Sequence, residues 1–161
     1  MTPPEAPRTP PPAIPPPAAR ARALAHVSIA TPDAEATARE YAALLGATVR
    51  HRETLEDRGL RVVFLDVAGV PLELIQPLDP ESATNTVARF LKARGPGLHH
   101  VAFHVEDAGQ ALDHARAQGA RLVDAAPRPG ADGCLVAFLH PQAASGVLIE
   151  FVEGGPPTPA R

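Results

Sequence analysis

Hydrophobic and polar residues alternate over two short runs that begin near residues 24 and 98. The runs are Leu24–Ala30, LAHVSIA, and Leu98–Val105, LHHVAFHV, and this alternation predicts β-strands. An aspartate follows each run, seven residues after His26 and His100, where it predicts the N-cap of a helix. The two helices are expected over Ala34–Leu45 and Ala108–Gln118, and a glycine follows each of them as a stop signal.

Three further extended runs follow each of these helices, and a connecting helix is expected over Ser82–Arg94. The order strand, helix and three strands therefore occurs twice, which indicates a tandem repeat of one supersecondary unit. Two copies would bury a shared apolar face, because neither half has enough core alone. The expected strands are Ala47–Thr54, Leu60–Val67 and Val70–Pro77 in the first half, and Arg121–Asp124, Gly133–Leu139 and Gly146–Val152 in the second.

Proline is concentrated at the two ends of the chain. Nine of the 20 prolines lie in the first 17 residues, and because proline fixes φ and lacks a backbone donor, both ends are predicted to be disordered. Deletion of residues 1–20 is accordingly expected to leave activity intact. The predicted organisation is a tail over 1–23, one domain over 24–153 (module one 24–80, linking helix 81–95, module two 97–153) and a tail over 154–161.

Charge and composition exclude several classes of function. The chain has 15 Lys and Arg against 18 Asp and Glu, a net charge of −3, so no basic excess exists to displace counterions from a nucleic acid. It shows no membrane-spanning stretch and no secretory signal, which predicts a cytoplasmic protein with no membrane partner. The single cysteine, Cys134, excludes an intramolecular disulfide and a zinc site built mainly from cysteine, and we expect it to be a packing residue.

Four titratable residues occupy matched positions in the two halves. LAHVSIATPD laid over LHHVAFHVED places His26 on His100, and VPLELI laid over VLIEFV places Glu73 on Glu150. Each lies within a hydrophobic strand, where a charged group is costly unless it is satisfied. The alternative is four unrelated polar positions on a water-facing sheet, but their repeat-equivalent placement favours one site. Two histidines and two glutamates suit a divalent ion: cobalt, zinc, nickel, manganese or magnesium.

The other histidines are predicted to lie outside this ligand set. His99 neighbours His100 and is expected on the opposite face of its strand. His104 shares the face of His100 but lies four residues along, ~13 Å at strand rise, so it is at most a substrate contact. His140 is expected in a turn at the same opening, and His51 is expected on the solvated surface.

The body of the chain resembles a known superfamily. The stretches PLELIQPLDPES, ARFLKARGPGLHHVAFHVED and FLHPQAASGVLIE are similar to the vicinal oxygen chelate superfamily, the glyoxalase fold, and within it to the methylmalonyl-CoA epimerases. The resemblance implies an α+β fold in which paired βαβββ modules form a curled mixed sheet around a metal site. It also implies that His26, Glu73, His100 and Glu150 bind a divalent ion.

The resemblance further implies a reaction, the interconversion of (R)- and (S)-methylmalonyl-CoA through a metal-stabilised enolate. Removal of the α-hydrogen generates negative charge that a divalent ion stabilises, and epimerisation needs an acid/base group on each face of the carbon. The implied catalytic groups are Glu150 and Asp57, the acidic residue two places before the glycine of LEDRGL. Relatives usually carry glutamate there, so the shorter Asp57 leaves Glu56 as an alternative.

The implied partner is a small acyl-CoA, and the resemblance leaves a homodimer open. Arg52, Arg58 and Arg61 near the opening are candidates for contacts with the CoA phosphates, and the alternative is that they are solvated surface arginines. Other functions occur on this fold. A glyoxalase-I-type lactoylglutathione lyase shares the ligand set, whereas a non-catalytic binding module usually loses the ligands retained here. An extradiol dioxygenase uses two histidines and one glutamate on iron in a longer chain. The stretches LEDRGL and FLHPQAASGVLIE favour the epimerase.

Overall fold

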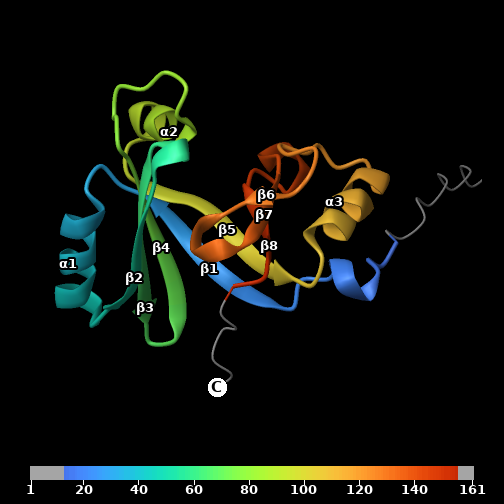
Figure 1. Ribbon diagram of the computed structural model, residues 1–161, viewed down its shortest axis with the longest axis horizontal. Coiled ribbons are helices and arrows are strands. Elements are labelled where there is room, and N and C mark those ends of the chain that lie inside the picture. The colour runs from blue at the N-terminus through green and yellow to red at the C-terminus, as the bar shows by residue number, and fades with distance from the viewer. Residues whose placement is uncertain (1–12, 156–161) are drawn as a thin grey trace, which may run out of the picture.

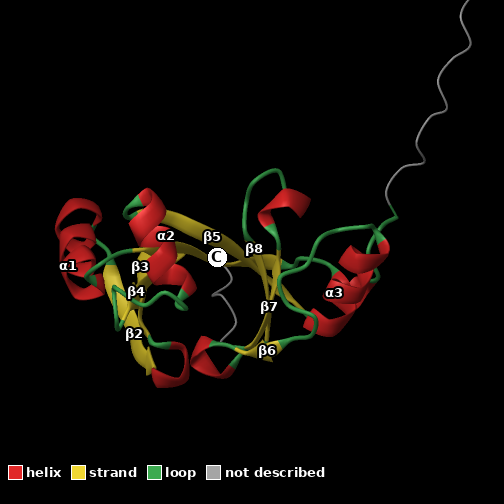
Figure 2. Ribbon diagram, turned by 90° about the horizontal axis from the view of Figure 1, so that it is seen from above, coloured by secondary structure: helices red, strands yellow, loops and turns green. Residues whose placement is uncertain are grey.

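The computed structural model describes residues 13–155, in which an eight-stranded mixed sheet curls into an arch (Figures 1 and 2). Helices α1 (Ala34–Leu45) and α3 (Ala108–Ala117) lie outside the arch on its two sides, and α2 (Thr86–Arg94) lies near one end. Among these residues, no helix is both long enough and apolar enough to cross a membrane. The strands are β1 Ala23–Ala30, β2 Thr48–Leu55, β3 Leu60–Val67, β4 Val70–Pro77, β5 Gly97–Val105, β6 Arg128–Pro129, β7 Leu135–Leu139 and β8 Ile149–Glu153.

The strand order β2-β3-β4-β1-β5-β8-β7-β6 consists of two equivalent halves that meet between β1 and β5. In each half the first strand runs parallel to the last, as β1 with β4 and β5 with β8, while β1 and β5 pair antiparallel. The predicted α+β fold of paired βαβββ modules in a curled mixed sheet is therefore confirmed. This topology brings the first and last strand of each module to the centre of the arch.

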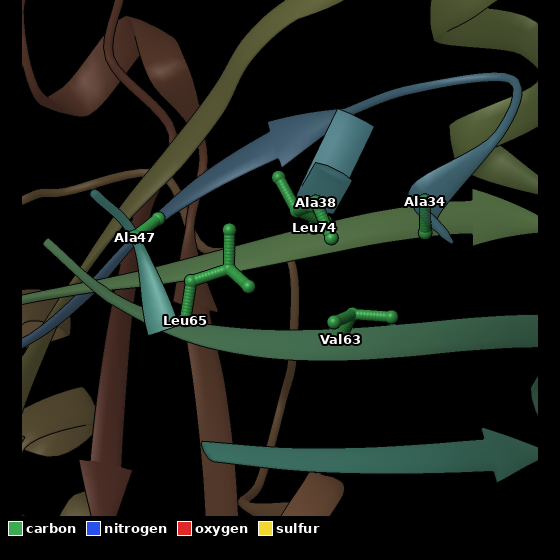
Figure 3. Packing of buried hydrophobic residues seen from close by; sticks show 6 residues of the cluster. All are labelled: Ala34, Ala38, Ala47, Val63, Leu65 and Leu74. Atoms are coloured by element: carbon green, nitrogen blue, oxygen red, sulfur yellow. The ribbon is translucent and has the colours of Figure 1, made fainter. Parts of the chain in front are cut away.

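Helix α1 fixes which face of the first half is available to a site. Asp33 caps the helix by accepting the N–H of Ala36 at 2.9 Å, which satisfies one free donor of the first turn. Its alanines bring the helix close to the sheet, and each fully buried leucine there contributes about 2 kcal/mol. Figure 3 shows this cluster, which consists of Ala34, Ala38, Ala47, Val63, Leu65 and Leu74. Because strand residues alternate, Glu73 next to Leu74 faces the opposite, inner side of the arch.

The segment before β1 packs against α3 and differs from the predicted disordered tail. Residues 17–19 form a short 3-10 helix, and Ala19 is buried against Val105 and α3. The carbonyl of Ala18 accepts the N–H groups of Glu106 and Asp107 at 3.1 and 3.0 Å. The prediction for 1–23 therefore does not hold for residues 13–23, while its remaining part, and residues 156–161 of the predicted tail 154–161, lie outside the described residues.

Deleting residues 1–20 should destabilise the protein, contrary to the expectation from the proline pattern. The deletion removes the Ala18 carbonyl and buried Ala19, and two lost hydrogen bonds cost about 2 kcal/mol in unfolding free energy. Deleting residues 1–12 leaves these contacts in place and serves as the matched control. Urea unfolding of the two truncations and the full chain measures the difference. Equal stability of all three would show that the segment contributes nothing.

The predicted strand Arg121–Asp124 is wrong, because only Leu122 of this run forms a bridge, to Leu139 of β7. Asp124 uses its side chain instead, since its carboxylate accepts the backbone N–H of Phe138 at 2.9 Å and Arg128 Nε at 3.0 Å. A side chain that takes a hydrogen bond in this way competes with regular strand pairing. The edge strand in this half is the short β6, which includes a proline as edge strands tolerate.

Candidate metal centre and its cavities

The four matched residues come from the four central strands, and the strand register brings them together. Across the β1–β4 and β1–β5 pairs, Ser28 lies opposite both Glu73 and His100. Across the β1–β5 and β5–β8 pairs, Ala102 lies opposite both His26 and Glu150. Residues directly opposite one another share a face of the sheet, so the four side chains converge over a floor of two small residues. Ser28 and Ala102 are both fully buried.

The distances between the four side chains match the spacing of ligands around one ion. The two imidazole Nε2 atoms of His26 and His100 lie 3.2 Å apart, and Glu150 Oε2 lies 3.0 Å from each of them. Glu73 Oε2 lies 3.4 Å from His26 Nε2 and 3.5 Å from His100 Nε2. With metal–ligand bonds of ~2.1 Å, neighbouring ligands in octahedral or tetrahedral geometry lie ~3.0–3.4 Å apart.

Burial and charge at this cluster also suit a cation. Within residues 13–155, the two buried side-chain polar atoms that lack a hydrogen-bond partner are Glu73 Oε2 and Ser28 Oγ, and such atoms are costly to bury. Burial opposes ionisation of Glu150, but hydrogen bonds with His100 and His26 outweigh it and lower its pKa to about 2. Burial likewise lowers the pKa of His26, but the two carboxylates raise it by more. The donor set therefore fits a divalent ion, which would also satisfy the buried carboxylate of Glu73.

Two cavities open onto the cluster from different sides, and Glu73 and Glu150 line both of them. The α2-side cavity, about 520 Å³, is bounded by the β2–β3 loop, the start of α2 and residues 128–131. The β2-side cavity, about 330 Å³, is bounded by strands β2, β7 and β8, and includes His104 and Cys134. Cys134 is buried in an apolar cluster, as expected of a packing residue. The cluster is thus accessible to a bound molecule from either cavity.

Asp57 lies on the α2-side cavity but outside the four-residue cluster, and its side chain is 80% exposed. Its loop is fixed in two ways. Gly59 adopts a left-handed conformation with φ 60°, which favours glycine. Asn85, the N-cap of α2, donates its side-chain amide to the carbonyls of Arg58 and Gly59 at 2.9 and 3.2 Å. Because Asn85 caps the helix, α2 begins at Thr86 instead of the predicted Ser82.

A β-bulge overturns the predicted orientation of His99. Ser28 pairs with His100 and Ile29 pairs with Leu98, so His99 is an extra residue that breaks the strand alternation. His99 therefore does not face away from the cluster: its Nδ1 lies 2.8 Å from Nδ1 of His100, and it lines the α2-side cavity. Burial there, with a further contribution from His100, lowers the pKa of His99 to about 4.

The structure also tests the predictions for three other histidines. A second bulge, between Val49 and His51, brings His51 to the β2-side cavity, where its ring stacks on Phe64 at 6.1 Å. The side chain of His51 is 46% exposed, so its predicted solvated position is confirmed, although it lies at the rim of this cavity. His104 lines the same cavity outside the cluster, as predicted, while its contact with a substrate stays a prediction. His140 lies in a turn, as predicted, and its Nδ1 accepts the N–H of Gln142, but it lines neither cavity.

Arg128, which sequence reasoning missed, shares the α2-side cavity with Arg58. The Nε of Arg128 lies 3.0 Å from the carboxylate of Asp124, and the guanidinium of Arg128 lies 5.3 Å from the centre of the Phe138 ring. Burial lowers the pKa of Arg58, and the charge of Arg128 lowers it further, so the two guanidinium groups repel each other. Two like charges held in one cavity favour a bound anion. Of the other predicted arginines, Arg52 pairs with Glu35 at 2.7 Å.

The chain belongs to the Glyoxalase/Bleomycin resistance protein/Dioxygenase superfamily, whose family model matches residues 25–138. It is 40% identical over 132 residues to the ethylmalonyl-CoA/methylmalonyl-CoA epimerase of Cereibacter sphaeroides, covering 81% of this chain and 96% of that protein. This relative places the chain beside CoA-ester epimerases within the superfamily.

Comparison with solved structures also finds methylmalonyl-CoA epimerases. The methylmalonyl-CoA epimerase of Mycobacterium tuberculosis matches with a TM-score of 0.74 and 38% identity, over 83% of this chain and 88% of that chain. A variant of the Streptomyces coelicolor methylmalonyl-CoA epimerase, in complex with 2-nitronate-propionyl-CoA, matches with a TM-score of 0.76 and 33% identity, over 85% of this chain and all of that chain. The predicted resemblance to the methylmalonyl-CoA epimerases is therefore confirmed.

Proposed function

We propose that this protein is a metal-dependent epimerase that interconverts (R)- and (S)-methylmalonyl-CoA. The observation that carries the proposal is the convergence of His26, Glu73, His100 and Glu150, with Nε2 and Oε2 atoms 3.0–3.5 Å apart, beside a cavity that contains two arginines. The similarity to epimerases over about four fifths of the chain supports the same reaction.

A divalent ion bound by the four side chains would supply Lewis-acid stabilisation of the negative charge that develops when the α-hydrogen leaves. Glu150 is the proposed base at one face of the α-carbon. Its Oε2 lies against both imidazoles, so Oε1 is the oxygen left to accept the proton. Asp57, from the opposite loop of the α2-side cavity, is the proposed acid/base group at the other face, with Glu56 as the alternative.

Asp57→Asn should abolish epimerisation while the protein still binds its metal ion, because an amide cannot exchange a proton at the second face. Glu150 remains in this variant, so the α-hydrogen of one epimer should still exchange with deuterium from solvent, with retention of configuration. Chiral analysis and mass spectrometry of the ester separate the two outcomes. Unchanged epimerisation would remove Asp57 from the mechanism, and Glu56→Gln then tests its neighbour.

Arg128→Gln should raise KM for the acyl-CoA by about tenfold or more with little change in kcat, because a charge-assisted hydrogen bond to an anion contributes about 1.5–3 kcal/mol. Asp124 and Phe138 hold the guanidinium in the cavity, so it is pre-organised for a carboxylate or phosphate. Arg39→Gln, on the exposed face of α1, is the matched control. An unchanged KM for Arg128→Gln would exclude the contact.

The proposed activity is tested by following the optical activity of enantiomerically pure (S)-methylmalonyl-CoA with metal-loaded protein. We expect decay to the equilibrium mixture. Turnover of the methylglyoxal–glutathione hemithioacetal in place of the CoA ester would assign the lyase activity instead. A cytoplasmic location and an ion from the series cobalt, zinc, nickel, manganese and magnesium remain proposals.

A further inference from the structure

The bulge in β5 gives the candidate ligand His100 a close neighbour that a regular strand would not supply. In a regular strand the side chain of His99 would lie on the far face of the sheet. The bulge instead places Nδ1 of His99 2.8 Å from Nδ1 of His100. This is hydrogen-bond distance, and it involves the ring nitrogen of His100 that faces away from the other three candidate ligands.

Chemistry decides which nitrogen donates in this pair. The Nε2 atom of His100 lies among Nε2 of His26 and the two glutamate oxygens, so it must offer a lone pair to a bound ion. A neutral imidazole carries one proton, which then resides on Nδ1 of His100. Nδ1 of His100 is therefore the donor, and Nδ1 of His99 is the acceptor.

Both imidazole rings are themselves held in place. The edge of His99 packs on Phe90 of α2 with ring centroids 5.0 Å apart. On another side of His100, the ring of Phe138 from β7 lies at 5.3 Å. The connecting helix and module two thus hold the two rings, so packing fixes the contact between the histidines and it is not a chance approach of exposed side chains.

We propose that His99 is a positioning residue, which accepts the Nδ1–H of His100 and so holds Nε2 of His100 unprotonated and aimed at the metal ion. The inference rests on the proposed metal-dependent function, and it assigns His99 no contact with the reacting atoms. Partners of this kind orient ligand imidazoles in metal sites, and their loss typically lowers metal affinity by about 10–100-fold.

Two substitutions distinguish the loss of the hydrogen-bond acceptor of His99 from the loss of its side-chain volume. His99→Asn places Oδ1 where Nδ1 stood and keeps an acceptor, whereas His99→Leu fills similar space without one. In titrations of the full-length protein with Co²⁺ against a competing chelator, we expect His99→Leu to lose about 10–100-fold in affinity and His99→Asn less than about threefold. His114→Leu on α3, outside both cavities, controls for removal of a histidine. Equal affinity of the Leu and Asn variants would overturn the proposal.

The tautomers of His99 and His100 provide a second readout, because a residue that only filled space would not determine which ring nitrogen carries the proton. In ¹⁵N spectra of the Zn²⁺-loaded unaltered protein, we expect the proton of His100 on Nδ1 and none on Nδ1 of His99. His99→Asn should preserve the Nδ1–H tautomer of His100. A proton on Nδ1 of His99 in the Zn²⁺-loaded unaltered protein would overturn the proposal, even where a variant fails to fold. Neither measurement uses turnover, so a protein that binds Co²⁺ but does not epimerise would refute the proposed function without deciding the role of His99.

Discussion

Glu150→Gln should lower kcat for epimerisation by about 10²–10⁴-fold, because general acid–base catalysis contributes a factor of this size and a carboxamide cannot accept the α-proton. The carboxamide oxygen can still bind an ion, so the variant should retain metal, although more weakly. Steady-state kinetics combined with metal analysis of the purified variant measures both effects. Glu150 has the burial and the neighbours expected of this dual role, since it lies within 3.0 Å of both imidazoles and lines both cavities.

Glu73→Gln is the matched control for that experiment. Glu73 contributes to the same cluster and receives the same change, but it is proposed as a ligand only. We therefore expect a loss in kcat of less than about tenfold once metal is saturating, far below the acid–base contribution. Equal losses in the two variants would show that Glu150 acts as a ligand alone.

Removal of the metal ion should abolish turnover and lower the melting temperature. Without a cation, Glu73 Oε2 remains buried without a hydrogen-bond partner, and the enolate charge loses its main stabilisation. A ligand that binds only the folded state at a free concentration of 100 Kd adds about 2.7 kcal/mol of stability. Chelation followed by titration with Co²⁺ or Zn²⁺, monitored by kinetics and calorimetry, should reverse both losses.

The double variant His26→Ala/His100→Ala distinguishes binding at this site from binding elsewhere. It removes the two imidazole ligands, which lie 3.2 Å apart at the centre of the cluster, so neither its activity nor its melting temperature should respond to added metal. Full activity of the chelated, unaltered protein would contradict metal dependence.

The four candidate ligands were predictable because the tandem repeat places the same residue types at equivalent positions of the two halves. One histidine in a strand carries little information, but His26 on His100 and Glu73 on Glu150 in the same alignment define four positions. The register then explains their meeting, since Ser28 and Ala102 each lie opposite two of them.

The surroundings of the site were not predictable, for identifiable physical reasons. A β-bulge changes side-chain orientation without a clear signal in the sequence, which is why His99 was placed on the wrong face. Arg128 lies in a segment where Asp124 replaces strand pairing with side-chain hydrogen bonds. Ala19 follows a proline-rich run, and its burial depends on a distant helix, α3.

Exchange of the α-hydrogen tests the central claim most directly. Metal-loaded protein is incubated with (R)-methylmalonyl-CoA in D₂O, and deuterium at the α-carbon and the configuration of the ester are followed together. We predict metal-dependent incorporation of deuterium accompanied by appearance of the (S) epimer, and loss of both on chelation. A protein that binds the ion but leaves the α-hydrogen unexchanged would contradict the proposed function.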